Sequence, residues 1–98
     1  MATIEIKRPH NLDREEAKRR AEALARSMED KLGIRWSWDS DRIRFDAPSG
    51  MAKGASGTVN VGAAEVRVEV DLPFLLKPMK GTIESKINQK LDDLLGRA

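Results

Sequence analysis

Apolar and polar residues alternate with a period of two over the stretch 58–72. The apolar positions on either side of the turn at 62–64 are Val59, Val61, Val66, Val68, Val70 and Leu72. In a β-strand this period places alternate side chains on opposite faces of the sheet. The stretch therefore predicts a β-hairpin with one charged face in water and one apolar face that other elements must cover.

Three shorter stretches alternate in the same way and predict further strands. They are residues 3–8, which Pro9 ends, residues 34–39 and residues 42–46. The acids and serine at 39–41 are typical of a tight turn, so the last two stretches form a second hairpin. Its apolar face would carry Ile34, Trp36, Trp38, Ile43 and Phe45.

Two stretches, 11–33 and 81–95, instead repeat their apolar residues at helical spacing. Asp13 is placed to cap the first helix, and Glu16 could bond back to the backbone of Asp13 in a capping box. Gly33 is expected to end this helix in a left-handed conformation. The second helix could begin as early as Pro78, with Gly96 as its end.

These elements predict the order β-α-β-β-β-β-α. Short hairpin connections make the five-stranded sheet antiparallel, and both helices need the same apolar face. We therefore expect an α+β fold in one domain, residues 1–98, with two helices packed on one face of the sheet. The glycine-rich stretch 47–57 is expected to be a long flexible connection.

Composition excludes several kinds of chemistry. The 98 residues include no cysteine, and no spaced set of histidines and carboxylates suggests a metal site, so neither a metal nor another cofactor is expected. The net charge is only +2 and the bases of the first helix alternate with acids, so nucleic-acid binding is not expected. No apolar run resembles a signal peptide or a membrane span, which favours a cytoplasmic protein.

His10 is the only histidine and the one residue whose type suggests acid–base catalysis. No nucleophile accompanies it, so we interpret it as a structural residue at the junction of strand and helix and expect no enzyme. The acid pairs Asp39 with Asp41 and Asp92 with Asp93 are expected to be solvated.

Two apolar groups have alternative interpretations. Trp36, Trp38 and Phe45 could line a ligand pocket, but their shared alternation favours core filling. The stretch 72–80, whose period is unclear, could seal the edge of the core, as the rarity of exposed apolar patches favours. It could also form a contact surface of Phe74, Leu75, Leu76, Lys77, Met79 and Lys80.

Several stretches together resemble the polyhydroxyalkanoic acid system protein family. The sequences that carry the resemblance are IEIKRPH at 4–10, IRWSW at 34–38, GTVNV at 57–61, VRVEV at 66–70 and GTIE at 81–84. The resemblance implies a small bacterial cytoplasmic protein linked to polyhydroxyalkanoate storage granules, with no established reaction and no catalytic residues to transfer.

The resemblance and the apolar stretch together suggest a function. We expect a non-enzymatic binding or regulatory protein whose partner is the granule surface or a granule protein, bound through the contact surface near Phe74. The alternative is a small carrier that holds an acyl or lipid-like ligand between sheet and helices, beside Trp36, Trp38 and Phe45. The sequence does not indicate an oligomeric state.

Overall fold

The computed structural model describes residues 3–50 and 52–95. Its elements in chain order are β1 (Ile4–Pro9), α1 (Arg14–Leu32), β2 (Arg35–Asp39), β3 (Arg42–Asp46), β4 (Ser56–Val61), β5 (Glu65–Asp71), the short 3-10 helix η1 (Phe74–Met79) and α2 (Lys80–Leu95). This order confirms the predicted α+β fold, with η1 as an addition that the sequence pattern did not indicate.

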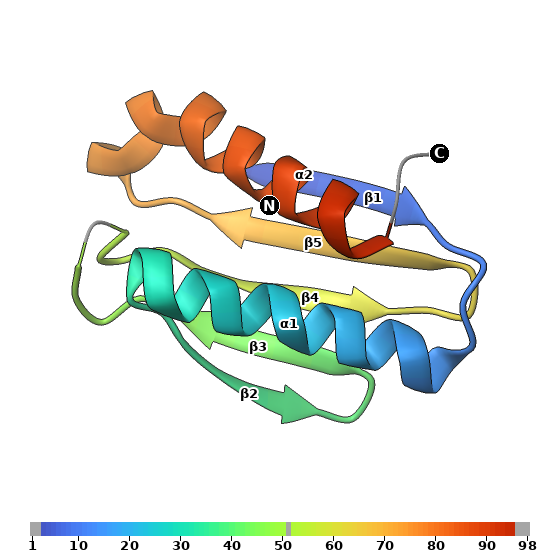
Figure 1. Cartoon of the computed structure of the whole chain (residues 1–98). Helices are drawn as coiled ribbons and strands as arrows, with labels where there is room; N and C mark the ends of the chain where they lie inside the picture. Colours follow the sequence, from blue (N-terminus) through green and yellow to red (C-terminus); the bar gives the residue numbers. More distant parts are fainter. Residues whose placement is uncertain (1–2, 51, 96–98) are drawn as a thin grey trace.

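The five strands form one sheet in the order β1-β5-β4-β3-β2, and every neighbouring pair is antiparallel. The first strand therefore pairs with the last, with Ile4 opposite Val70 and Ile6 opposite Val68. Both helices lie on the same face of this sheet and run antiparallel to each other (Figure 1), α1 against β2, β3 and β4 and α2 against β1. The predicted two-layer arrangement is confirmed.

The core lies between the helices and the apolar face of the sheet. Its largest fully buried side chains are Ile4, Leu24, Ile43, Leu91, Val59, Val66 and Val68. Gly57 lets β4 pass beneath Phe45, since a Cβ at this position would lie 2.0 Å from the Glu69 carbonyl oxygen and 2.7 Å from Phe45 Cζ. The alternation at 58–72 and the helical stripes thus identified the core correctly.

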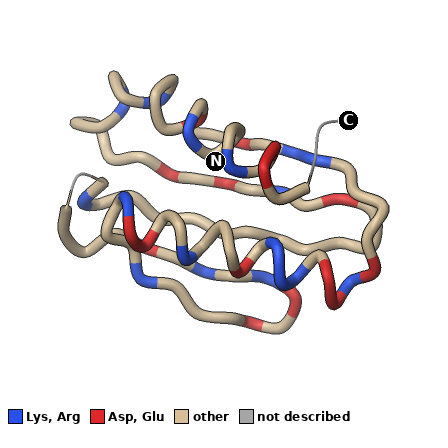
Figure 2. The backbone as a smooth tube through the Cα atoms, viewed as in Figure 1, with Lys and Arg blue, Asp and Glu red and all other residues tan. Residues whose placement is uncertain are grey.

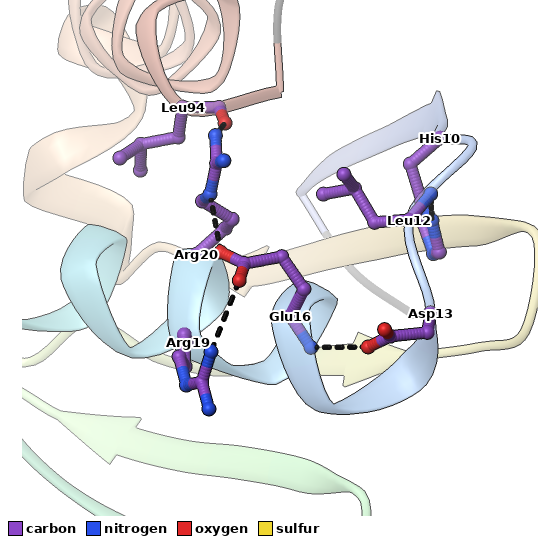
Figure 3. Close-up of polar contacts among 7 residues, drawn as sticks. All are labelled: His10, Leu12, Asp13, Glu16, Arg19, Arg20 and Leu94. Carbon is purple, nitrogen blue, oxygen red and sulfur yellow. Dashed lines mark hydrogen bonds and ion pairs between the residues drawn. The ribbon is translucent and has the colours of Figure 1, made fainter.

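The ends of α1 follow local chemistry. Asp13 accepts a 2.8 Å hydrogen bond from the Glu16 backbone N–H, and Gly33 ends the helix at φ 73°. The return half of the capping box was wrong, because the Glu16 carboxylate instead accepts hydrogen bonds from Arg19 and Arg20 (Figure 3). Charged partners within one helical turn offer stronger hydrogen bonds than the Asp13 amide.

The same Arg20 links the two helices. Its guanidinium also donates to the backbone carbonyl of Leu94, near the end of α2. The last carbonyls of a helix have no partner within the helix, so a cation there is favourable. Arg20 thereby fixes the end of α2 against the beginning of α1.

The glycine-rich connection is more ordered than the sequence suggests. Ala47, Ala52 and Ala55 are buried, and backbone hydrogen bonds run from Ala47 N–H to Ala55 and from Gly54 N–H to Ala47. The described part of this connection therefore packs against the core, since small alanine side chains let its backbone approach closely.

At the far end of the chain, α2 begins at Lys80 directly after η1, and its predicted terminator Gly96 lies outside the described residues. Over residues 3–50 and 52–95, none of the helices is both long enough and apolar enough to span a bilayer.

Candidate contact surface

The stretch between β5 and α2 exposes two large apolar side chains. After the buried Leu72, Pro73 starts the 3-10 turn η1, in which the Leu76 N–H donates to the Pro73 carbonyl at 2.9 Å. In this turn Phe74 and Leu75 are 81% and 86% exposed. No other large hydrophobic residue in the described part of the chain is exposed to solvent in this way.

The two interpretations of this stretch each hold for part of it. Leu76 and Met79 are half-buried and pack against the core, as expected of residues that seal its edge. Phe74 and Leu75 point away from the core, so the core interpretation was wrong for them. A 3-10 helix has three residues per turn, so adjacent side chains cannot all face one layer.

Cationic side chains border the two exposed residues. Lys77 lies within η1 and Lys80 begins α2, and both are exposed. No acid occurs between Asp71 and Glu84 in the sequence. In Figure 2 the turn between β5 and α2 is accordingly only blue and tan. We call Phe74, Leu75, Lys77 and Lys80 the contact surface, with Leu76 and Met79 as its half-buried support.

The glycine-rich loop supports this surface from beneath. Gly54 has φ 94°, and a Cβ built there would lie 3.0 Å from Pro73 Cγ. Only glycine adopts this conformation without strain, so the loop backbone can lie directly against the first residue of the turn. The loop therefore helps to position Phe74 and Leu75.

Trp36 and Trp38 lie at the margin of the core rather than within it. Both come from β2, the strand at the edge of the sheet, and both are half-buried. Their indole N–H groups donate to α1, Trp36 to Glu29 at 2.8 Å and Trp38 to Glu22 at 2.9 Å. The expectation that they fill the core holds only in part, because polar ring nitrogens need a hydrogen-bond partner.

Cations of α1 lie over both tryptophan rings. The Lys18 ammonium lies 4.9 Å from the Trp38 ring centre, and the Arg26 guanidinium lies 5.9 Å from that of Trp36. Such cation–π contacts contribute roughly 0.5–1 kcal/mol at exposed sites. The rings thus fasten β2 to α1.

Phe45, the third residue suggested to line a ligand site, is buried in the core. The space between sheet and helices beside it is occupied by Leu24, Ile43 and Val59, each with 0% exposure. Phe45 lies directly opposite Trp36 in the β2–β3 pairing, and both line an open surface hollow, whereas Trp38 lies opposite Ile43.

His10 is held by hydrogen bonds at both ring nitrogens. Its Nδ1 accepts from the Leu12 N–H at 3.1 Å, so Nε2 carries the proton and donates to the Gly62 carbonyl at 3.0 Å. The side chain is 8% exposed, beside Leu12 before α1 (Figure 3). This geometry supports the structural interpretation, because both nitrogens are already occupied.

The paired acids differ from one another. Asp39 and Asp41 stay half-exposed near the β2–β3 turn, where they form ion pairs with cations such as Arg42 and Lys18. Asp92 is not simply solvated, because it binds Arg8 of β1 at 2.5 Å and only 28% of its side chain is exposed. Among residues 3–50 and 52–95 we found no group of three or more histidine or acidic side chains able to hold a metal ion.

Two glutamates of α1 have shifted ionisation. The hydrogen bond from Trp38 lowers the pKa of Glu22, with a further contribution from Arg26. The hydrogen bond from Arg20 likewise lowers the pKa of Glu16. Both shifts arise from contacts that hold the helices and β2 together, so they indicate structural roles.

Comparison with known proteins adds a family to this description. No curated protein matches the chain. A family model described as "Putative polyhydroxyalkanoic acid system protein" matches residues 4–95. This span runs from the first residue of β1 to the last of α2 and includes His10, both tryptophans and the whole contact surface. The chain therefore belongs to the polyhydroxyalkanoic acid system protein family.

Proposed function

We propose that this protein is a non-enzymatic binding module that attaches to the surface of polyhydroxyalkanoate granules through its contact surface. The observation that carries the proposal is the 81% and 86% exposure of Phe74 and Leu75. Burying two such side chains contributes roughly 1.5–3 kcal/mol each. Family membership supplies the context of polyhydroxyalkanoate metabolism.

The neighbouring charges suit a surface that is apolar with anionic groups. Lys77 and Lys80 have no described carboxylate within 4.0 Å, so their charges are available to a partner. Their long aliphatic stems can lie on an apolar surface while the ammonium groups stay in water. A short turn with two apolar side chains followed by two lysines would therefore rest on such a surface without unfolding.

The proposal includes no enzymatic role because the residues best suited to acid–base chemistry are already engaged in structural contacts. His10 has both ring nitrogens engaged with backbone groups, and the lowered pKa of Glu22 keeps that carboxyl ionised at neutral pH. A general base instead needs access to a substrate proton and a pKa near the working pH.

Co-sedimentation with isolated granules tests the proposal. The wild-type protein should pellet with granules, and the double variant Phe74→Ser/Leu75→Ser should stay in the supernatant. The control Phe74→Leu/Leu75→Met keeps the surface apolar and should pellet like the wild type. Circular dichroism should show all three folded, since Phe74 and Leu75 are outside the core.

Granules stripped of their proteins identify the partner. Binding to stripped granules supports direct attachment to the surface. Binding that requires intact granules would replace this proposal by attachment to a granule protein. If the wild type pellets with neither, or if the serine variant binds as well as the wild type, the contact surface is not the binding site.

A further inference from the structure

The register of the sheet shows which backbone groups of its edge strand β2 are left without a partner. The Val61 N–H of β4 donates to the Asp41 carbonyl, just before β3, at 2.9 Å. The Ala47 N–H, just after β3, donates to the Ala55 carbonyl at 2.8 Å. Odd-numbered positions of β3 therefore face β4 and even-numbered ones face β2, because the direction of the backbone groups alternates along an antiparallel strand.

The same alternation determines the direction of the backbone groups in β2. Arg35, Ser37 and Asp39 pair with the even-numbered residues of β3, so their backbone groups point into the sheet. Trp36 and Trp38 thus direct their N–H and C=O groups outward, where β2 is the last strand. In Figure 1 no helix or strand lies beyond it. This edge of the sheet can therefore accept a further strand.

The two edges of the sheet differ in how well they resist such pairing. β1, at the other edge, carries Lys7 and ends in Pro9, which has no N–H to donate. Lysine and proline in an edge strand discourage its pairing with other chains. The sequence of β2, RWSWD, contains neither. The edge formed by β2 thus lacks this protection.

The sequence of β2 is complementary to itself in the antiparallel direction. A pairing centred on Ser37 places Trp36 opposite Trp38 of a second copy. It also places Arg35 opposite Asp39. The outward backbone groups of Trp36 then meet those of Trp38, as a hydrogen-bonded pair of an antiparallel ladder requires. A shift of one residue would oppose outward to inward groups, and a shift of two would separate Arg35 from Asp39.

Charges would alternate across the seam of this pair on the open face of the sheet. Within one chain, Arg35 donates to Asp46 at 3.0 Å and Arg42 donates to Asp39 at 3.2 Å. The pairing would join these two ion pairs end to end, with Arg35 beside Asp39 of the second copy. The side chains of Arg35 and Asp39 are 72% and 48% exposed, so both can take a second partner. Opposite charges across strands stabilise a pairing and like charges oppose it, which favours this antiparallel arrangement.

The tryptophans would gain cover on the other face. Trp36 lies opposite Phe45 and Trp38 opposite Ile43 within one chain, and both indoles are half-buried. Setting Trp36 against Trp38 of a second copy would continue this apolar row across the seam. Aromatic pairs across neighbouring strands are among the stabilising contacts of a sheet.

We propose that two copies of the chain join through β2 in an antiparallel pair centred on Ser37, which extends the sheet and keeps all the helices on one face. A pairing along one short strand buries less area than a typical stable interface, so the dimer should be weak, with a Kd in the micromolar range. The inference is independent of the contact surface, which lies between β5 and α2 and shares no residue with β2.

Sedimentation velocity from micromolar to millimolar concentration tests the proposal. The wild type should pass from monomer to dimer. Ser37→Lys sets like charges opposite each other at the exposed centre of the pairing and should raise the dimer Kd at least tenfold. Ser85→Lys makes the same change at an exposed position of α2 and should behave like the wild type.

Three outcomes of this experiment would overturn the proposal. A wild type that stays monomeric would leave the edge open to a strand of another protein. Undiminished dimerisation of Ser37→Lys would place the interface elsewhere. Loss of the dimer in Phe74→Ser/Leu75→Ser would identify the contact surface as the interface between copies.

A cysteine at the centre of the pairing tests its register. The chain has no cysteine, so Ser37→Cys introduces the only one. Residues opposite each other at a non-hydrogen-bonded position have Cα atoms about 4.5 Å apart, within the range that a disulfide spans. Under mild oxidation Ser37→Cys should form a disulfide-linked dimer at least tenfold faster than Ser85→Cys. Equal rates would contradict the register.

Charge reversal tests the direction of the pairing. Arg35→Asp makes both ends of the strand acidic and Asp39→Arg makes both basic, so each variant alone should stay monomeric. An equal mixture restores opposite charges at both ends and should form a heterodimer. Both positions are exposed, so circular dichroism should show each variant folded. A mixture that dimerises no better than its components would refute the contact between Arg35 and Asp39.

Discussion

Arg8 on β1 donates a 2.5 Å hydrogen bond to Asp92 on α2, which lies 84 residues away in the sequence. Both side chains are mostly shielded, with 22% and 28% exposure. Arg8 also donates to the Asn88 side chain at 3.0 Å. One arginine thus joins the first strand to the last helix, at an edge of the sheet.

Removing Asp92 should destabilise the protein. Asp92→Ala leaves a half-buried guanidinium without its carboxylate, which should lower the free energy of unfolding by about 1–2 kcal/mol. The neighbouring Asp93 is exposed, so Asp93→Ala should change it by less than about 0.5 kcal/mol. Urea denaturation measures both, and equal effects would show that the ion pair contributes nothing.

Two glycines should respond to alanine in opposite ways. Gly57→Ala would place a Cβ 2.0 Å from a backbone oxygen of β5, so the strands must move apart, and we expect a loss of about 3 kcal/mol or more. Gly81 lies in α2 with no atom within 4 Å of its Cβ position, so Gly81→Ala should stabilise by about 0.5–1 kcal/mol. Thermal unfolding of both variants checks the pair; a stable Gly57→Ala protein would contradict the register of β4 and β5.

His10 should be replaceable by a residue that supplies the same acceptor. His10→Ala leaves the Leu12 N–H without its partner and should cost about 1–3 kcal/mol. Asparagine can place an oxygen near the position of Nδ1, so His10→Asn should cost less. Equilibrium unfolding compares them. If His10→Asn retained stability but lost granule association, the residue would have a role beyond structure.

Acid should loosen the attachment of β2 to α1. The pKa of Glu22 is lowered in the folded protein, so the carboxylate contributes stability above the ordinary glutamate pKa and loses it as pH falls through the lower, folded value. We expect stability to decline below about pH 4.5, with a change in tryptophan emission. Glu22→Gln can still accept from Trp38 but does not titrate there, so its decline should be shallower; an unchanged pH profile would contradict the assignment.

The sequence predicted the fold well because its strongest patterns are local. The alternation at 58–72 follows the two-residue period of a strand, and a glycine at position 33 favours a left-handed end to the helix. Neither signal depends on distant residues. The position of both helices on one face also followed from the sequence, because each helix has one apolar stripe and the sheet has one apolar face to cover. These features appear in the structure with boundaries shifted by only a few residues.

The candidate sites depended on contacts that no local pattern encodes. Asp92 looked solvated because its partner Arg8 lies at the opposite end of the sequence. The burial of Ala52 and the outward direction of Phe74 depend on how the loop meets η1. Likewise, Lys31 and Lys86 come to line the same small hollow only after the helices have packed.

Because β1 pairs with β5, the sheet cannot be completed during translation until β5 has been synthesised. Ile4 emerges from the ribosome well before Val70, its partner, has been added. At about 5–20 residues per second, several seconds pass in which the first strand has no neighbour. A nascent chain halted before β5 would present Ile4 and Ile6 to other chains, so this interval is where a chaperone would be most useful.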